Sequence, residues 1–262
     1  MTDDAEPLLF EPKDHDQPSV FRAENLLREG RRQRRRPDVA VPAVCLLDPD
    51  GDLVRFLLRT GRATEHPGWA CYHTTLWTFE LDGRQVGVVG CAVGAPFAVL
   101  VAEQLAASGC DLLISVTSSG SVTEVAGPSH FVLIDRALRD EGTSLHYLAP
   151  SRWSDAPEHL IAHLGAAFDG IPERVVTAPT WTTDAPYRET EAAIARAAKL
   201  GAVAVEMEAA ALYAYAAASG RDVVCVAHVT NTMATEGDDF DKGEADGAEA
   251  ALRVVTAILR AL

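Results

Sequence analysis

The sequence Val205-Glu206-Met207-Glu208-Ala209-Ala210-Ala211-Leu212-Tyr213 places two carboxylates where an apolar strand passes into an alanine-rich helix. The run before it, residues 201–205, is short and β-like, and apolar residues then recur at helical spacing until Gly220. A carboxylate at such a junction can accept strong hydrogen bonds from a sugar diol. A plainer interpretation is that Glu206 and Glu208 only complement the positive end of the helix dipole.

Strand and helix patterns alternate outward from this stretch. Further strands are predicted at 41–47, 69–81, 85–91, 112–116, 131–137, 175–179 and 223–229, and further helices at 54–61, 97–108, 158–168, 190–200 and 246–262. With 262 residues and 48% hydrophobic content, the chain can bury one large core. The patterns predict an α/β fold with a single domain, in which a central mixed β-sheet is flanked by helices as a three-layer α/β/α structure.

Residues 1–37 are predicted to form an N-terminal arm attached to a domain of residues 38–262. The arm is acidic at first, then holds a short helical pattern at 22–30, and ends in the arginine-rich run 31–36 before Pro37. Such a run can bind anions or nucleic acid, or it can be a solvated arm that contacts an acidic neighbouring subunit. The net charge of −15 favours the second interpretation.

Composition excludes several classes of protein. The net charge of −15 and the pI of about 4.9 disfavour nucleic acid as a partner. No signal peptide and no apolar run of about 20 residues is visible, so we expect a cytoplasmic protein that does not cross a membrane. Five cysteines without C-x-x-C spacing indicate reduced core thiols and no metal site. The acidic loop 233–243 does not match an EF-hand, and we expect it to be exposed.

The stretch 205–213 resembles the ribose-binding segment of the nucleoside phosphorylase superfamily, which includes uridine phosphorylase and the hexameric purine nucleoside phosphorylases. Other segments between residues 44 and 262 are similar to further family motifs, in the same order. They are the phosphate-loop pattern Gly51-Asp52-Leu53-Val54-Arg55, the glycine turn Gly90-Cys-Ala-Val-Gly94-Ala-Pro96, the strand Leu112-Leu-Ile-Ser-Val-Thr-Ser118-Ser-Gly120, the segment Arg139–Tyr147 and the base-pocket segment Thr182–Tyr187. Segment 139–147 looks most like the uridine phosphorylase branch.

The resemblance implies a pentosyltransferase that cleaves a nucleoside with phosphate, giving free base and ribose 1-phosphate. It implies no cofactor, inorganic phosphate as co-substrate, and a homo-oligomer, either a dimer or a hexamer. The phosphate would bind Gly51, Arg55, Thr117 and Ser118, beyond the carboxyl ends of the strands. A glycine lets the backbone approach an anion closely, and a guanidinium offers a fixed fork of donors. The alternative is that this loop is only a turn without a phosphate site, since the sequence D-P-D-G strongly favours a turn.

Ser115 departs from the family pattern, because an arginine usually stands three residues before the hydroxyl donor Ser118. Either His73 and an arginine of the N-terminal arm make up the missing charge, or the nucleophile is water and the enzyme is an N-glycosidase. A non-catalytic nucleoside-binding protein of the same fold is a further alternative. A dinucleotide-binding dehydrogenase is poorly supported, because Pro96 replaces the third glycine of its fingerprint.

For the ribose, the resemblance assigns Glu208 to the 2′ and 3′ hydroxyls and Met207 to packing beneath the sugar, with Glu206 and His73 as further contacts. A nearby carboxylate also stabilises the positive charge that develops when C1′ is attacked. Arg55, Glu208 and Asn231 are therefore the predicted catalytic residues.

The base end is predicted from the position 23 residues after Glu208, where purine-specific relatives have an aspartate and this chain has Asn231. An amide donates a hydrogen bond but is no general acid, which favours a uridine-like pyrimidine, as does segment 140–147. Tyr187 could stack on the base, and Arg188 and Glu189 could read its edge, unless these residues only begin the following helix. His228 is a further candidate, although a histidine on an apolar strand is more often a core residue.

Overall fold

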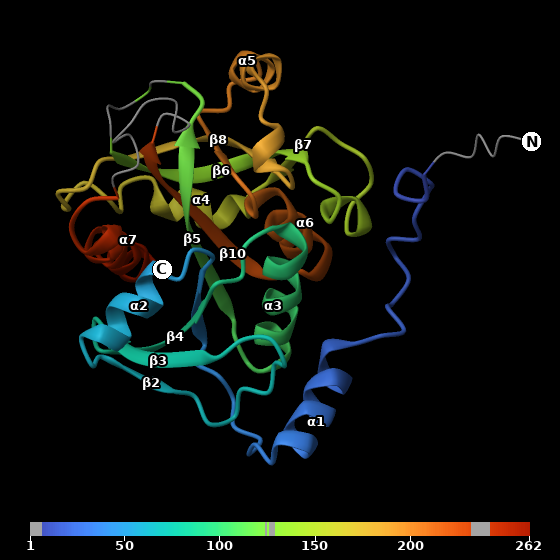
Figure 1. Ribbon diagram of the computed structural model, residues 1–262, viewed down its shortest axis with the longest axis vertical. Helices are drawn as coiled ribbons and strands as arrows, with labels where there is room; N and C mark the ends of the chain where they lie inside the picture. Colours follow the sequence, from blue (N-terminus) through green and yellow to red (C-terminus); the bar gives the residue numbers. More distant parts are fainter. Residues whose placement is uncertain (1–6, 124, 126–128, 232–241) are drawn as a thin grey trace, which may run out of the picture.

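The computed structural model describes residues 7–123, 125, 129–231 and 242–262, and its centre is one ten-stranded mixed β-sheet (Figure 1). The path through the sheet runs β10-β6-β8-β9-β5-β1-β4-β3-β2, and β7 pairs with β6. The strands are β1 (Val44–Asp48), β2 (Ala63–Glu65), β3 (Leu76–Leu81), β4 (Arg84–Gly90), β5 (Leu112–Ser121), β6 (His130–Asp140), β7 (Trp153–Asp155), β8 (Val175–Thr183), β9 (Ala204–Glu206) and β10 (Asp222–Asn231).

One half of the sheet closes on itself. Strand β5 pairs in parallel with both β1 and β10, and its last residues pair antiparallel with β9. Strand β10 then pairs with β6, β6 with β8, and β8 with β9, so these strands and β5 form a ring. The carboxyl ends of the parallel strands β5 and β10 meet at one rim of this ring, where parallel strands place ligand sites, and β9 pairs antiparallel with the end of β5 there.

Helices cover both faces of the sheet, as the sequence predicts (Figure 1). Buried residues of α3 and α6 belong to the core on one face, and those of α2, α4 and α7 to the core on the other. These helices are α2 (Asp52–Arg59), α3 (Ala95–Ala107), α4 (Glu158–Leu164), α6 (Ala209–Ser219) and α7 (Ala248–Ala261), and α5 (Glu191–Lys199) lies at the rim. The α/β class with a central mixed sheet flanked by helices is confirmed. None of the helices described is long and apolar enough to span a bilayer.

Tyr213 fixes α6 over the ring. Its side chain is fully buried, its hydroxyl donates to the Ile134 carbonyl at 2.6 Å, and it accepts from the Cys225 backbone N–H at 3.0 Å. One side chain thereby satisfies a backbone group on each of two neighbouring strands, β6 and β10. These two bonds hold α6 against β6 and β10, and the helix begins directly after the end of β9.

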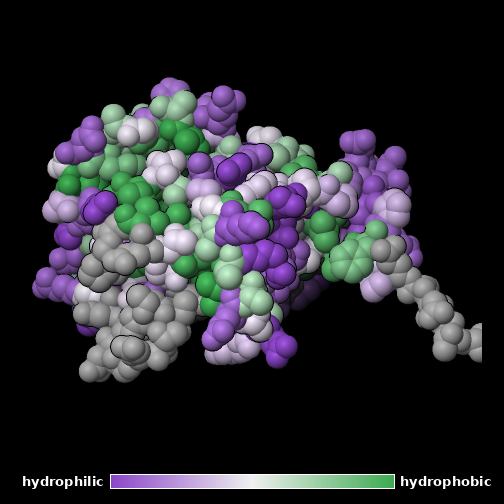
Figure 2. Space-filling model, turned by 90° about the horizontal axis from the view of Figure 1, so that it is seen from above, coloured by the Kyte–Doolittle hydropathy of each residue, from purple (hydrophilic) through white to green (hydrophobic). Residues whose placement is uncertain are grey.

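The N-terminal arm contains α1 (Ala23–Arg34), which is longer than the predicted 22–30 and takes in part of the arginine run. Leu27 is buried, and a Cβ on Gly30 would lie 2.6 Å from the Ala70 carbonyl oxygen, so α1 packs closely on the 69–71 segment. Arg34 donates to the carbonyls of Cys71 and Tyr72 at 2.7 and 3.0 Å. The part of the arm before α1 contacts the segment 142–147, where the His15 ring hydrogen-bonds the Leu145 carbonyl at 3.2 Å and Leu9 lies beside Gly142. Several hydrophobic side chains of this part of the arm are exposed (Figure 2).

Several predicted strand boundaries are wrong. Residues 69–75 are not a strand, because the buried residues 69–71 pack under α1 and Trp69 donates to the Thr74 hydroxyl. Strands β5, β6 and β8 continue past the predicted ends at 116, 137 and 179 through polar residues. The apolar pattern ends there, but the closed ring still supplies backbone partners to those residues. The short strands β2 and β7 were not predicted from the sequence.

Candidate functional site

A cavity of about 320 Å³ is lined by residues at the carboxyl ends of β5, β9 and β10. It is the larger of two cavities at this site and is called the large cavity below. Segments far apart in the sequence supply its lining: the loop after β1, the end of β5, the turn before α5, the β9–α6 junction and the end of β10. The sequence-predicted residues that it brings together are Thr117, Ser118, Tyr187, Glu206, Met207, Glu208 and Asn231, together with Glu189. A cavity of this size is in the range of small-molecule sites.

Glu208 is the residue from which α6 starts, and its carboxylate lines the cavity. One oxygen accepts from the Gly94 N–H at 2.8 Å, which ties the glycine turn before α3 to the β9–α6 junction. The other accepts from the Met207 N–H at 3.3 Å. Burial raises the pKa of Glu208, and the neighbouring charge of Glu206 raises it further. Its oxygens still have lone pairs for donors of a ligand.

Glu206 is held differently, because four donors converge on its carboxylate. One oxygen accepts from the hydroxyls of Thr180 at 3.0 Å and Thr182 at 2.5 Å. The other accepts from the backbone N–H groups of Glu208 and Ala209, both at 2.7 Å. These two N–H groups belong to the start of α6 and have no partner within the helix. Burial raises the pKa of Glu206. Through its bonds to the two N–H groups, Glu206 fixes the start of α6, where Glu208 lies.

Gly51, at the predicted phosphate loop, adopts a left-handed backbone with φ of 79° before α2. A Cβ there would lie 2.6 Å from the Cys91 sulfur and 2.9 Å from an Arg55 guanidinium nitrogen, so only glycine fits. Its N–H already donates to the Asp48 carboxylate at 3.1 Å, and the second oxygen of Asp48 accepts from the Val54 N–H at 3.0 Å. Burial raises the pKa of Asp48 to about 7.

Arg55 lies beside this loop and is more than half exposed. Its guanidinium is ion-paired with Asp52 and donates to the Asp50 carbonyl at 3.0 Å. It does not line the large cavity. The guanidinium that is predicted to hydrogen-bond phosphate is therefore bound, in this structure, by carboxylate and carbonyl oxygens.

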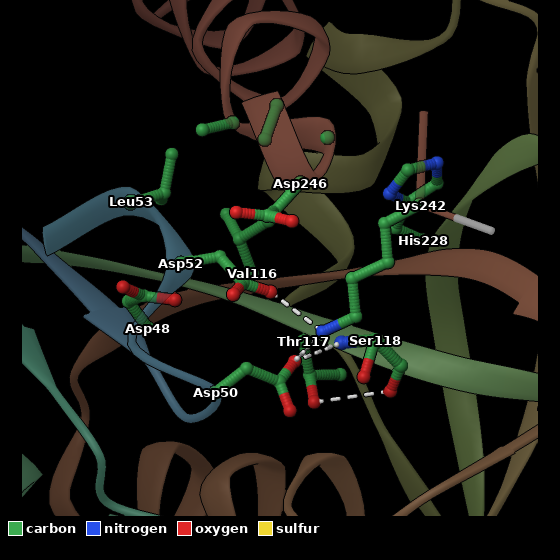
Figure 3. A pocket seen from close by; sticks show the side chains of 13 residues that line it. Asp48, Asp50, Asp52, Leu53, Val116, Thr117, Ser118, His228, Lys242 and Asp246 are labelled. Carbon is green, nitrogen blue, oxygen red and sulfur yellow. Dashed lines mark hydrogen bonds and ion pairs between the residues drawn. The ribbon is translucent and has the colours of Figure 1, made fainter. Parts of the chain in front are cut away.

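Asp50 joins the loop to the end of β5 (Figure 3). Its carboxylate accepts from the Ser118 N–H at 2.8 Å and lies 3.6 Å from the Lys242 ammonium group. Lys242 also forms an ion pair with Asp52 at 2.5 Å. Asp50, Thr117 and Ser118 line both the large cavity and a small one of about 20 Å³ beside the loop. Neither Asp50 nor Lys242 is among the predicted site residues: Asp50 belongs to the D-P-D-G turn, and Lys242 lies near the end of the acidic loop 233–243.

Besides Gly51 and Arg55, three predicted site residues lie outside the large cavity. His73 is exposed, and its ring meets Phe97 edge-on at a centroid distance of 6.4 Å. Arg188 is exposed and does not line this cavity. His228 stacks on Phe131 at 4.2 Å on the side of the small cavity, and burial lowers its pKa to about 4, so it is neutral and packed.

At the base end, Tyr187 is 99% exposed while it lines the cavity, so a stacked base would cover it. Glu189 lines the same cavity, and burial raises its pKa. Asn231 ends β10 at the rim. The segment 140–147, which favoured a pyrimidine, does not line this cavity; His146 and Tyr147 line another one, beside α3 and the arm.

Ser115 is completely enclosed in the sheet, paired in register with Leu47 on β1 and Cys225 on β10. It supplies no charge to the site. Ser119, four residues on, is buried in the cavity lining, and no described residue bonds its hydroxyl. Within the described part of the chain, no group of three His, Cys, Asp or Glu residues is arranged to hold a metal ion. The acidic residues of the 233–243 loop lie outside the described residues.

Comparisons with known proteins agree with this geometry. The family model of the phosphorylase superfamily matches residues 43–260. The chain is 24% identical over 190 residues to a guanosine phosphorylase from Halorubrum lacusprofundi, covering 69% of this chain and 78% of that protein. Its fold is similar to uridine phosphorylase from Vibrio fischeri, with a TM-score of 0.69, 17% identity and coverage of 84% and 90% of the two chains.

The fold is also similar to a 5'-methylthioadenosine/S-adenosyl homocysteine nucleosidase from Campylobacter jejuni. That match has a TM-score of 0.69 at 14% identity and covers 85% of this chain and all of the other. At such identities the likeness establishes a shared fold, and the chemistry has to be argued from the site.

Proposed function

Because the chain belongs to the phosphorylase superfamily, we propose that it is a nucleoside phosphorylase that transfers the ribosyl group of a nucleoside to phosphate. The observation that carries the proposal is the buried Glu208 carboxylate, which faces a cavity large enough for a nucleoside at the carboxyl ends of three strands. A carboxylate in this position accepts from the 2′ and 3′ hydroxyls, and Met207 packs beneath the sugar. Glu206 is the positioning residue that holds Glu208 in place.

In the proposed reaction a phosphate oxygen forms a bond to C1′ while the bond from C1′ to the base nitrogen breaks. The electron pair of that bond leaves with the base, which takes up a proton from solvent. Phosphate binds at the loop through Arg55, Gly51, Thr117 and Ser118. In its ionised form, Glu208 stabilises the oxocarbenium-like C1′ of the transition state.

For the base we propose a nucleoside whose base carries a lactam edge, a carbonyl beside a ring N–H, as in uracil, hypoxanthine and guanine. Glu189 would accept from the ring N–H and Asn231 would donate to the carbonyl, while Tyr187 would stack on the ring. The uridine-like preference predicted from the sequence falls within this class, as does guanosine, after which the Halorubrum lacusprofundi relative is named. Adenine and cytosine present an amino group and a ring acceptor, which this pair matches less well.

The test is a chromatographic screen for free base with uridine, inosine, guanosine, adenosine and cytidine, each with phosphate. We expect release from at least one lactam nucleoside, at a higher kcat/KM than from adenosine or cytidine. Release from the two amino-base nucleosides alone would contradict the base assignment. The absence of release from all five would contradict the enzymatic proposal, and nucleoside binding without turnover would then indicate a binding protein.

The contact between Asp50 and the Ser118 N–H favours a second candidate, hydrolysis of the same bond by water. The small cavity beside the loop has a volume of about 20 Å³. Such a volume holds about one water molecule. Base release that continues at the full rate after phosphate is removed would support this candidate. A homo-oligomer, dimer or hexamer, stays a prediction.

A further inference from the structure

The phosphate loop of this chain holds a carboxylate where an incoming anion needs donors. Phosphate would have to collect hydrogen bonds from the loop backbone, from Arg55 and from the end of β5. The Ser118 N–H, at the end of β5, already donates to Asp50 at 2.8 Å. The Gly51 N–H donates to Asp48, and the Arg55 guanidinium is paired with Asp52. Each of these donors is therefore occupied by an aspartate of the same loop.

The charge around the loop adds to this occupancy. Asp50 and Asp52 face two cations, Arg55 and Lys242, and both cations are engaged with loop oxygens. Asp246 lines the small cavity beside the loop. Ser115, enclosed in the sheet, adds no cation to them. A phosphate dianion entering this group meets carboxylates a few ångströms away, and such like-charge repulsion is weakly screened in a partly buried site.

Space points in the same direction. The small cavity among Asp50, Thr117, Ser118 and Lys242 has a volume of about 20 Å³ (Figure 3). That is room for about one water molecule and is too little for phosphate. The Asp50 side chain lies at the wall shared by this space and the large cavity, so its withdrawal would join the two.

We propose that Asp50 selects the acceptor of the reaction: its carboxylate fills the anion subsite, so phosphate binds only when Asp50 leaves the Ser118 N–H. This inference rests on the proposed function for the identity of the acceptor. It assigns to a residue outside the recognised motifs the control of phosphate affinity. Removing the charge of Asp50 strengthens phosphate binding, and removing its side chain strengthens binding further.

The experiment is an isothermal titration of the full chain with inorganic phosphate, at fixed ionic strength and without nucleoside. Asp50→Asn removes the charge and keeps an oxygen that can accept from Ser118, whereas Asp50→Ala removes the occupant as well. The matched control is Asp111→Asn, which changes the net charge equally at the exposed position directly before β5, at the opposite end of that strand. Melting curves without phosphate identify any variant that fails to fold.

We expect the phosphate Kd to fall by about tenfold in Asp50→Asn and by more in Asp50→Ala, with no change in the control. Equal Kd values in the wild type, both Asp50 variants and the control would overturn the inference. An equal gain in Asp111→Asn would overturn it as well, because net charge alone would then explain the effect. Since this titration needs no turnover, an inactive chain can still pass it. An active phosphorylase whose Asp50 variants bind phosphate unchanged would refute the inference alone.

Discussion

Replacing Glu206 tests whether this carboxylate holds the helix start that presents Glu208. Glu206→Ala deletes the acceptor of two threonine hydroxyls and of two backbone N–H groups. The hydroxyls can turn to other acceptors, but the two N–H groups are fixed by α6 and remain buried. Each unsatisfied buried donor costs about 1–3 kcal/mol, which gives about 2–6 kcal/mol for the pair. Relief from burying a charge offsets part of this, so we expect a net loss of about 2–4 kcal/mol in the free energy of unfolding.

Glu206→Gln separates hydrogen bonding from charge. The amide oxygen can face the two backbone N–H groups, and the amide nitrogen can donate to the hydroxyls of Thr180 and Thr182, which can act as acceptors. All four contacts then persist, while the cost of burying a charge disappears; burial raises the pKa of Glu206, which is the sign of that cost. We expect the free energy of unfolding to stay within about 1 kcal/mol of the wild type.

Urea unfolding followed by circular dichroism, together with kcat/KM for the best nucleoside, distinguishes the two glutamates. Glu208→Gln should leave stability within about 1 kcal/mol and lower kcat/KM by roughly 30- to 1000-fold, the loss of about 2–4 kcal/mol of transition-state binding. Glu206→Ala should lose both stability and activity. The reasoning is refuted if Glu206→Ala unfolds at the wild-type free energy, or if Glu208→Gln keeps the wild-type kcat/KM.

Three further outcomes are expected. Arg55→Ala should raise the KM for phosphate by about tenfold or more and change the nucleoside KM by less than about twofold, in steady-state titrations of each substrate; equal shifts would remove Arg55 from the anion site. Burial raises the pKa of Asp48 from 3.8 to about 7, so the native state keeps a proton that the unfolded chain releases. The free energy of unfolding should therefore fall by up to about 4 kcal/mol as pH rises between those values. Asp48→Asn should reduce this dependence on pH, measured by urea unfolding at several pH values. The same pH dependence in the variant and the wild type would contradict this assignment. Glu189→Gln should lower kcat/KM for lactam nucleosides by about tenfold and leave amino-base nucleosides unaffected, and a parallel loss on both would show that Glu189 does not read the base.

The fold class was predictable because the periodicity of apolar residues distinguishes strands from helices. The β9–α6 junction was identified from two carboxylates after an apolar run. The closure of the ring was not predictable in the same way. It depends on β5 continuing through the polar residues 117–119, which pair with β10, to Gly120 and Ser121, which pair with β9. Pairing between strands distant in the sequence leaves no local signal in such residues.

Some features of the candidate site were likewise predictable from the apolar pattern, and others were not. Ser118, Met207 and Glu208 lie at the rim because each ends or follows a strand that the apolar pattern marks. Motif position alone could not show that Glu206 is already bound by four donors or that Asp50 takes the Ser118 N–H. Those facts depend on side-chain directions, which the closed ring sets.

The most direct test of the account is a ³¹P NMR spectrum of the purified protein incubated with phosphate and the lactam nucleoside that releases base fastest. Phosphorolysis gives a growing ribose 1-phosphate signal, equal in amount to the free base, and Glu208→Gln should slow that growth by at least about 30-fold. Free base and free ribose with an unchanged inorganic phosphate signal would contradict phosphorolysis and identify the protein as a hydrolase.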